Sequence, residues 1–471
     1  MLFKIALRNI VRNARRSAMT ASAIAVGAIA MVVFGEYMAL IVKGFETGVV
    51  AHSGHLVVFQ EGYYEFGAGN PAGYSISGYR SVIDLIKDDR ELKPMVRVVT
   101  PTVSLFGIAG NFDIGASKTF LGAGVVPSDQ ETMIHWDDYG LNQLALRTLH
   151  RSTVLPFPLK DNDETHGIVG IGLARMLGLC APLKVPNCPS PLKPASAAKI
   201  EAVPDVNLAE LASRDRLPAA PRSKEPRIDL LTATAAGAPN VVSLFIREAR
   251  SQNFKEIDDM YVGMDIALAQ QLLYGRGEHK AVSIVVQLFH TADVSRAGAR
   301  LNALFKQHGL HLEVRDFKEL QPQYNQVIGL FGAIFVFIAV IMSIIVLFTV
   351  VNTMTMSVME RTNEIGTVRA MGVRRSGIRR QFLIEGWMLG VIGATSGLIL
   401  CAVIAYWFNR AGFTWTPPGQ ARAIPLLLKD SGEWGLKLAV WLGLVVMATV
   451  AALIPANRAA RLPVVDALRH V

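Results

Sequence analysis

Few side chains in this sequence stand at spacings that support catalysis. Gly110–Thr119 (GNFDIGASKT) has two glycines five residues apart, as a phosphate-binding loop does, but Ala116 stands where that loop requires a lysine. We therefore expect a turn between strands there. The sequence has no HExxH, GxSxG or paired CxxC pattern, and His135, His150 and His166 are scattered in loop-like sequence, where we expect solvated side chains. These patterns predict no catalytic residue, no metal site and no cofactor bound by this chain.

Two of the three cysteines stand close together in a proline-rich run. Cys180 and Cys188 enclose the sequence CAPLKVPNC, and no histidine stands at metal-ligand spacing beside them. In an exported, oxidising location this arrangement predicts a disulfide that closes the loop. Cys401 lies in an apolar segment, where we expect it to serve packing.

A dense charged pattern follows a long apolar segment, in residues 357–371. Its charged side chains are Glu360, Arg361, Glu364 and Arg369. Glu360 and Glu364 are one helical turn apart, and Ile365, Val368 and Met371 form an apolar edge. A short helix with an apolar ridge and a charged rim fits a groove on a partner protein. The alternative is a helix lying flat on anionic lipid, against which the carboxylates on the rim argue.

Four apolar segments surround this pattern and are long enough to cross a bilayer. The chain is 51% hydrophobic and only 18% charged, which indicates several spans together with a water-facing domain. The predicted spans are residues 17–43, 326–356, 381–409 and 436–456. The charge-free run Val327–Met359 is longer than a hydrocarbon core needs, so we expect it to project into water as a continuous helix. Glu36 and Glu385 lie near span ends, where we expect headgroup-level exposure or pairing with an arginine, for Glu385 with Arg379 or Arg380.

Basic residues near the spans are concentrated on one side, with only Arg410, Arg422 and Lys429 in the short loop between the third and fourth spans, and this bias sets the orientation. They concentrate in residues 1–16, which read as an interfacial amphipathic helix, in residues 357–380 and in the tail 457–471. Both termini and the 357–380 loop are therefore expected in the cytoplasm, with 44–325 and 410–435 outside. The net charge of +9 is explained by this bias, and nucleic-acid binding is not expected. We expect the first span to be a retained anchor; the alternative is a cleaved signal peptide.

The external region 44–325 is large enough for its own core and is predicted to form two lobes. β-α-β patterns at both ends of the region indicate one split ferredoxin-like lobe, to which Asp259–Leu273 is expected to return. A second, β-rich lobe is predicted at about 168–255, with a flexible proline-rich insert at 182–226. The segment Asp316–Tyr324 is either a rigid lead-in to the second span or an ordinary linker.

Four stretches of the sequence resemble a known family. MERTNEIGTVRAMGVRRSGIRRQFLIEG resembles the signature of FtsX/MacB-type permeases of ABC transporters, also called type VII or mechanotransmission transporters. ALRNIVRNARRSAMTASAIAVG is similar to the opening helix and first span of that family, IGLARMLGL to a segment of its periplasmic domain, and PANRAARLPVVDALRH to its C-terminal tail. The resemblance is good in the membrane part and poor in the middle of the external domain.

This resemblance implies a fold class: an α-helical membrane protein with four transmembrane helices and a large, MacB-like α+β periplasmic domain inserted between helices 1 and 2. It places the chain in the bacterial inner membrane. It implies pairing with a second permease copy or a related permease, and with two cytoplasmic ATPase subunits that bind ATP and Mg. The 357–380 loop would hold the coupling helix. Carried onto this chain, its ATPase contacts would be Glu360, Arg361, Glu364, Ile365, Gly366, Arg369, Ala370, Met371 and Gly372.

The sequence departs from the family in two places. It has no fused nucleotide-binding domain of the MacB kind, so we expect the ATPase to be a separate polypeptide. Residues 180–240 are an insertion relative to the lipoprotein-releasing permeases. The expected function is a permease subunit that moves a hydrophobic or amphipathic substrate, such as a lipoprotein, lipid, peptide or drug, with a periplasmic adaptor or carrier as a further partner. The alternative is a non-transporting, FtsX-like signalling protein that activates a periplasmic cell-wall hydrolase; the large exterior favours transport.

Overall fold

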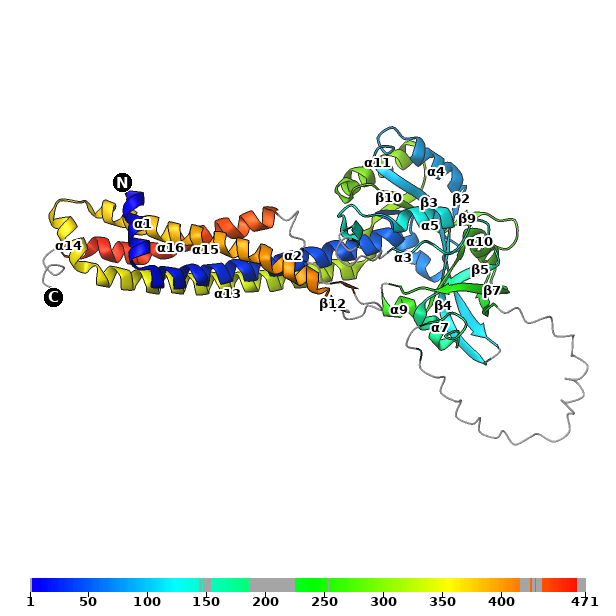
Figure 1. Ribbon diagram of the computed structural model, residues 1–471. Helices are drawn as coiled ribbons and strands as arrows, with labels where there is room; N and C mark the ends of the chain where they lie inside the picture. The colour runs from blue at the N-terminus through cyan, green and yellow to red at the C-terminus, as the bar shows by residue number, and fades with distance from the viewer. Residues whose placement is uncertain are drawn as a thin grey trace, which may run out of the picture.

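The computed structural model shows an elongated molecule in which a bundle of long helices joins a β-rich domain (Figure 1). The helix α1 (Leu2–Arg12) lies at the end of the bundle far from that domain (Figure 1). The described residues are 2–112, 114–143, 146, 154–185, 188, 225–252, 254–415, 424–425, 428 and 434–463. The β-rich domain is formed by the chain between the first and second long helices, as the order of the predicted spans requires.

Four helices are long and apolar enough to cross a membrane. They are α2 (Ala14–Ser53), α13 (Pro322–Glu360), α15 (Arg375–Ala411) and α16 (Trp434–Arg461). The four predicted spans are confirmed as helices, but each helix is longer than its span. The largest difference is in α2, which continues to Ser53 where the predicted span ends at residue 43.

Glycines let α15 pack closely between α2 and α16. A Cβ atom added at Gly386 would lie 2.5 Å from the Cβ of Ala452 on α16. A Cβ atom at Gly397 would lie 2.6 Å from the Cβ of Ala28 on α2. Small residues at these positions allow helix backbones to approach, which is the main source of helix association where no hydrophobic effect acts.

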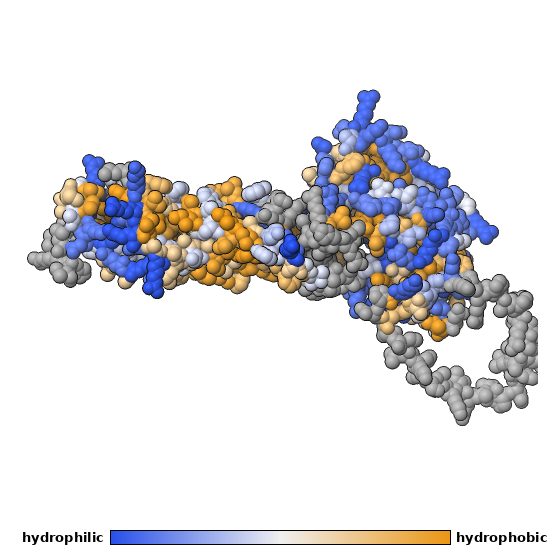
Figure 2. All heavy atoms as spheres, viewed as in Figure 1, coloured by the Kyte–Doolittle hydropathy of each residue, from blue (hydrophilic) through white to orange (hydrophobic). Residues whose placement is uncertain are grey.

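Aromatic side chains mark the two membrane surfaces on the bundle. Trp387 and Trp407 on α15 are both exposed and are separated by about 30 Å along the helix, the thickness of a hydrocarbon core. Figure 2 shows the apolar surface between the charged end near α1 and the β-rich domain. On α2 and α13 the boundary nearer that domain falls at Tyr37 and Phe331, whose rings lie 6.4 Å apart. Since α2 ends at Ser53, it continues about 24 Å beyond this boundary.

The β-rich domain contains one nine-stranded sheet, in the order β11-β1-β10-β3-β4-β8-β5-β7-β6. The strands are β1 (Leu56–Gln60), β3 (Val96–Asn111), β4 (Ala116–Val125), β5 (His166–Val169), β6 (Arg227–Ala233), β7 (Pro239–Ala249), β8 (Tyr261–Asp265), β10 (Ser283–Leu288) and β11 (Leu312–Asp316). Helices of this domain include α4 (Tyr79–Asp88), α5 (Pro127–Ile134), α7 (Ile171–Met176), α10 (Ile266–Tyr274), α11 (Val294–Gln307) and α12 (Phe317–Leu320).

The first hydrophobic core lies in the half of the sheet made by β11, β1, β10 and β3, all antiparallel to their neighbours. Two β-α-β units build it, β1-α4-β3 from the beginning of the inserted chain and β10-α11-β11 from its end. The apolar side chains of α4 recur at helical spacing, so Tyr79, Val82, Ile83 and Ile86 are all buried on one face. On α11, Leu301 is buried completely.

The long helices are fixed rigidly to this first core. The carboxylate of Glu46, near the end of α2, accepts hydrogen bonds from the hydroxyls of Tyr139 at 2.5 Å and Tyr324 at 3.0 Å. Phe317 of α12 and Tyr324 at the beginning of α13 are both buried in the core. Of the two alternatives for Asp316–Tyr324, the structure therefore supports the rigid lead-in.

The second hydrophobic core lies in the other half of the sheet and is larger than the lobe predicted at 168–255. It includes Phe120 of β4, Met264 of β8 and Leu268 of α10. The reason is the strand order: β8 pairs with β4 on one side and with β5 on the other. The segment Asp259–Leu273, expected in the first lobe, therefore belongs to the second core. The insert predicted at 182–226 lies outside the described residues except at its two ends.

Candidate functional site

The charged segment between α13 and α15 forms a short, tight elbow, defined here as residues 357–380. α13 ends at Glu360, and α14 (Thr362–Ala370) follows after one residue. Gly372 has a φ of 94°, in the left-handed region that favours glycine, and allows the chain to turn towards α15. Figure 1 places α14 at the end of the bundle far from the β-rich domain. The short helix predicted from the sequence is present.

One side of α14 is packed against the bundle. Ile365 is buried in a small cluster with Val358, Phe382 and Ala459, from α13, α15 and α16. At the other end of α14, Nη1 of Arg369 donates a hydrogen bond to the carbonyl oxygen of Leu462. The elbow is therefore held by three of the four long helices.

A ring of polar side chains, which we call the polar ring, joins α1 to the elbow. It consists of Asn9, Glu385, Arg361, Glu364 and Arg12. Asn9 Nδ2 donates to Glu385 Oε1 at 2.6 Å, and Arg361 Nη1 lies 3.1 Å from the same oxygen. Arg361 Nε lies 3.0 Å from Glu364 Oε2, and Arg12 Nη2 lies 2.8 Å from Glu364 Oε1. The ring closes on α1, because Asn9 and Arg12 are both on that helix.

The two carboxylates of the ring differ in burial. The side chain of Glu385 is 5% exposed, whereas those of Glu364 and Arg12 are 51% and 52% exposed. The hydrogen bond from Arg12, together with Arg361, lowers the pKa of Glu364. Glu385 pairs with an arginine, as expected, but the partner is Arg361 and not Arg379 or Arg380, because positions five and six residues apart do not share a helix face.

The structure divides the nine predicted contact residues into two groups. Exposed residues are Glu360, Glu364, Ala370, Met371 and Gly372, and Arg369 is half-buried. Buried residues are Arg361, Ile365 and Gly366. The buried residues therefore pack inside the elbow and do not form part of the surface that a partner protein could contact. Sequence reasoning missed Asn363 and Thr367, which are also exposed on α14. They are four residues apart, so the helical spacing in the sequence could have placed them on one face of the helix. It also missed Asn9 and Arg12.

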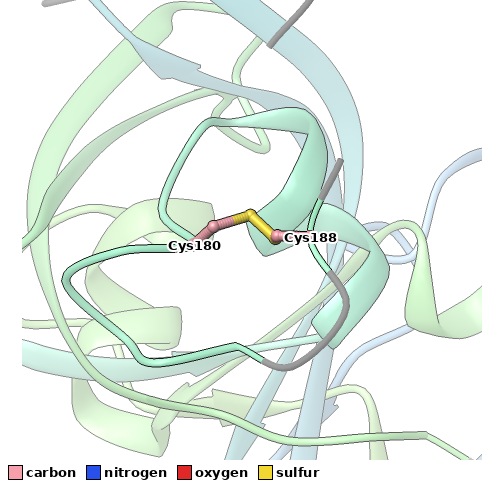
Figure 3. Close-up of a disulfide and its surroundings, with 2 residues drawn as sticks. All are labelled: Cys180 and Cys188. Carbon is pink, nitrogen blue, oxygen red and sulfur yellow. A yellow bond between two sulfur atoms is a disulfide. The ribbon is translucent and has the colours of Figure 1, made fainter. Parts of the chain in front are cut away.

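The remaining candidate residues are spread over the β-rich domain. Cys180 and Cys188 form a disulfide beside α7, with their Cα atoms 6.1 Å apart (Figure 3). Gly110–Thr119 contains the turn between β3 and β4, as predicted, together with the end of β3 and the beginning of β4. His166 is half-buried and hydrogen-bonded to Asp163, so it is not the solvated side chain expected.

His135 is exposed as expected, and His150 lies outside the described residues. Cys401 is buried in α15. In the part of the chain that the structure describes, no group of three or more His, Cys, Asp or Glu side chains could hold a metal ion.

Comparison with known proteins identifies the membrane part. The family model "FtsX-like permease C-terminal" matches residues 336–464, which include most of α13, the elbow, α15 and α16. The chain is 48% identical over 81 residues to the ABC transporter permease YtrF of Bacillus subtilis, which covers 17% of this chain and 18% of that protein. It is 32% identical over 164 residues to the macrolide export ATP-binding/permease protein MacB of Rhodopirellula baltica, over 33% and 21% of the two chains.

The MacB protein of Neisseria meningitidis serogroup A is 30% identical over 194 residues, or 41% of this chain and 28% of that protein. The chain thus spans only 18% to 28% of the length of these three relatives. The family model includes the whole elbow together with α15 and α16, which help to hold it. The four long apolar helices indicate a multi-pass membrane protein, and its residues 336–464 are similar to the C-terminal part of FtsX-like permeases, as its relatives among the ABC transporter permeases of the MacB type also indicate.

Proposed function

We propose that this chain is the membrane subunit of a transporter that receives force from a separate cytoplasmic ATPase at α14 and passes it to the β-rich domain outside the membrane. The ATPase would bind ATP and Mg, and this chain would have no catalytic site of its own. The MacB relatives are named ATP-binding/permease proteins, which supports an ABC ATPase as the partner.

The observation that carries the proposal is the continuity of α13. This helix has 39 residues, so it is about 58 Å long. One end is joined to α14 through the single residue Arg361, and the other end is held in the first core through Tyr324. Movement of the elbow along the bundle would therefore reach the β-rich domain without passing through a flexible linker.

The orientation follows from charge. The elbow is rich in arginine, at Arg361, Arg369, Arg374, Arg375, Arg379 and Arg380. Cytoplasmic loops of membrane proteins carry such an excess. We therefore infer that α1, the elbow and the end of α16 face the cytoplasm of a bacterial inner membrane, with the β-rich domain in the periplasm. The disulfide between Cys180 and Cys188 supports this, since an oxidising compartment lies on that side.

We propose that the complex contains two ATPase subunits and a second permease, either another copy or a related chain. Support comes from α13, whose most apolar stretch is only 11% buried within this chain. That surface is available to lipid and to a second permease.

The substrate is proposed to be hydrophobic or amphipathic and to be handled on the outer side of the membrane. A cavity of about 30 Å³ lies between α1, α13 and α15, lined by residues that include Asn13, Thr353 and Ser357. It has room for about one water molecule, whereas ligand sites are about ten times larger. This cavity is therefore no substrate site. The MacB relatives are named for macrolide export, which supports an amphipathic substrate, with an adaptor or carrier protein as a further partner.

The test of the ATPase contact uses an exposed residue that is not part of the polar ring. Met371 is 73% exposed, so Met371→Asp leaves the packing of α14 intact. We expect the wild-type chain, purified from its host in mild detergent, to bring down an ABC ATPase, and Met371→Asp to reduce the amount at least tenfold. Phe112→Asp, at a 76% exposed residue of the β-rich domain, is the matched control and should capture as much as wild type. Equal capture by both variants would exclude α14 as the contact.

The orientation is tested by labelling. A cysteine introduced at the exposed Thr367 should react with a membrane-impermeant maleimide only after the cells are opened. A cysteine at Phe112 should react in spheroplasts. If both react from the same side, the elbow and the β-rich domain are not separated by the membrane and the proposal fails.

A further inference from the structure

The helix α1 is bound to the elbow on one face and is apolar on the opposite face. Phe3, Leu7 and Val11 recur every four residues and are 52%, 47% and 66% exposed. Asn9 and Arg12, three residues apart, face the other way and make the contacts of the polar ring. An amphipathic helix with such an exposed apolar face lies in the headgroup layer of a membrane. α1 is thus placed between the membrane surface and the elbow.

The contacts of the ring differ in strength because they differ in exposure. Arg361 and Glu385 are buried, Arg361 also lies over the ring of Phe382 at 5.8 Å, and breaking a buried pair of this kind is strongly unfavourable. Arg12 and Glu364 form an exposed pair, which is weak in comparison. The packing of the elbow against the bundle therefore does not depend on Arg12. Arg12 adds a link between α14 and α1.

We propose that Arg12 is a positioning residue for coupling: by holding Glu364, it ties the elbow to α1, so that α14 and the membrane-bound helix move as one unit. This inference rests on the proposed function, in which a cytoplasmic ATPase moves α14. With the link intact, α14 meets the ATPase at an angle set by α1 and the membrane surface. Without it, α14 keeps its buried packing, its bond from Arg369 and the pair of Glu364 with Arg361, but it loses its direct contact with α1, and part of the ATPase movement is lost as rotation of the elbow.

The chain offers a matched control on the same helix. Arg8 lies one turn before Arg12, is also exposed, and makes no ion pair with any residue that the structure describes. Replacing either arginine removes the same charge from the same helix, so both changes weaken attraction to anionic lipid equally. Only the change at Arg12 removes the contact with Glu364.

The first experiment measures ATP hydrolysis by the complex of this chain with its ATPase, in nanodiscs that contain anionic lipid. The variants are Arg12→Lys, Arg12→Gln and Arg12→Glu, with Arg8→Gln and Arg8→Glu as controls. We expect all of them to retain the ATPase to within twofold. Stimulation of ATP hydrolysis by the permease should fall at least fivefold in Arg12→Glu, less in Arg12→Gln, and by less than twofold in Arg12→Lys, which keeps the charge. Equal stimulation in Arg12→Glu and Arg8→Glu would overturn the proposal.

The second experiment does not need the ATPase. Spin labels at the exposed positions Leu7 and Thr367, in a Cys401→Ser background, report the distance between α1 and α14. The distance distribution should broaden in Arg12→Glu and remain as in wild type in Arg8→Glu. An unchanged distribution in Arg12→Glu overturns the link even if no ATPase is ever captured. Conversely, a wild-type chain that captures no ATPase but shows the broadening would refute the proposed function and leave the link standing.

Discussion

The histidine that follows α2 gives a prediction that can be worked out in full. His55 is buried between the rings of Trp136 and Phe317, whose centroids lie 5.0 Å and 6.3 Å from its own. The backbone N–H of Leu288 donates to its Nδ1 at 3.0 Å. Because Nδ1 accepts, the neutral ring carries its proton on Nε2, which lies 3.2 Å from Thr291 Oγ1 and donates to it.

Protonation of His55 would disrupt this arrangement, and the loss can be estimated. Burial lowers the pKa of His55 from 6.5 to about 3, against an opposing effect of the Asp138 carboxylate. A lowered pKa means that the unfolded chain binds the proton first as the pH falls. The contribution to stability is therefore complete above pH 6.5 and is lost as the pH falls from there towards 3. Between pH 7.5 and pH 5 the loss is about 2 kcal/mol, which is roughly a thirtyfold rise in the opening constant.

Hydrogen exchange on the full-length protein in nanodiscs measures this opening in the strands around His55. The peptides of interest cover β10 and the β11–α12 segment, and protection factors correct for the intrinsic exchange rate at each pH. Protection in wild type should fall about fourfold between pH 7.5 and pH 6 and about thirtyfold by pH 5. The control is His55→Asn, whose side-chain oxygen keeps an acceptor near the Nδ1 position but does not titrate. It should be weaker at every pH and nearly independent of pH, and an identical pH dependence in the two proteins would refute the reasoning.

Three other predictions concern stability. Glu46→Ala removes the acceptor of the buried Tyr324 hydroxyl and one partner of the half-buried Tyr139, and should lower the free energy of unfolding by about 2 kcal/mol, seen as a lower melting temperature; Glu61→Ala, at an exposed acid, should have almost no effect. Gly397→Val should destabilise the bundle by about 1–3 kcal/mol because its Cβ would meet α2, whereas Gly443→Val, with no atom within 4 Å, should be tolerated, and equal melting temperatures would contradict the close packing. Cys180→Ser should lower stability by about 2–3 kcal/mol, from the loop that the disulfide closes, and make the melting temperature insensitive to a reducing agent.

The membrane part could be predicted from the sequence because its signals are local. An apolar run of about twenty residues is a helix wherever it lies in a bilayer, and arginines beside it set the orientation. The elbow helix could be predicted because its signal is also local: Glu360, Glu364 and Ile365 lie within two helical turns. The exact helix ends were not readable: α2 continues to Ser53 because its last turns are buried in the first core and not in lipid.

The polar ring could not be predicted, because it joins residues more than 300 positions apart. From the sequence, Arg12 is one of several similar cations on a basic helix, and nothing distinguishes it from Arg8. The partner of Glu385 was likewise sought among the arginines nearest in sequence, and the partner is Arg361, the residue between α13 and α14. The second core was underestimated for a related reason: strand order, which places β8 between β4 and β5, is not a local property.

One strand connects the two halves of the β-rich domain. β3 has 16 residues and contributes to both hydrophobic cores, so it forms a beam about 50 Å long. Since β3 has no break between the two cores, the half of the domain around the second core cannot swing freely about the half around the first core. A tilt of about 10° at the end of β3 in the first core, which also holds the long helices, would move the other end of the strand through roughly 9 Å, so a small displacement at the first core would be enlarged at the far end of the second.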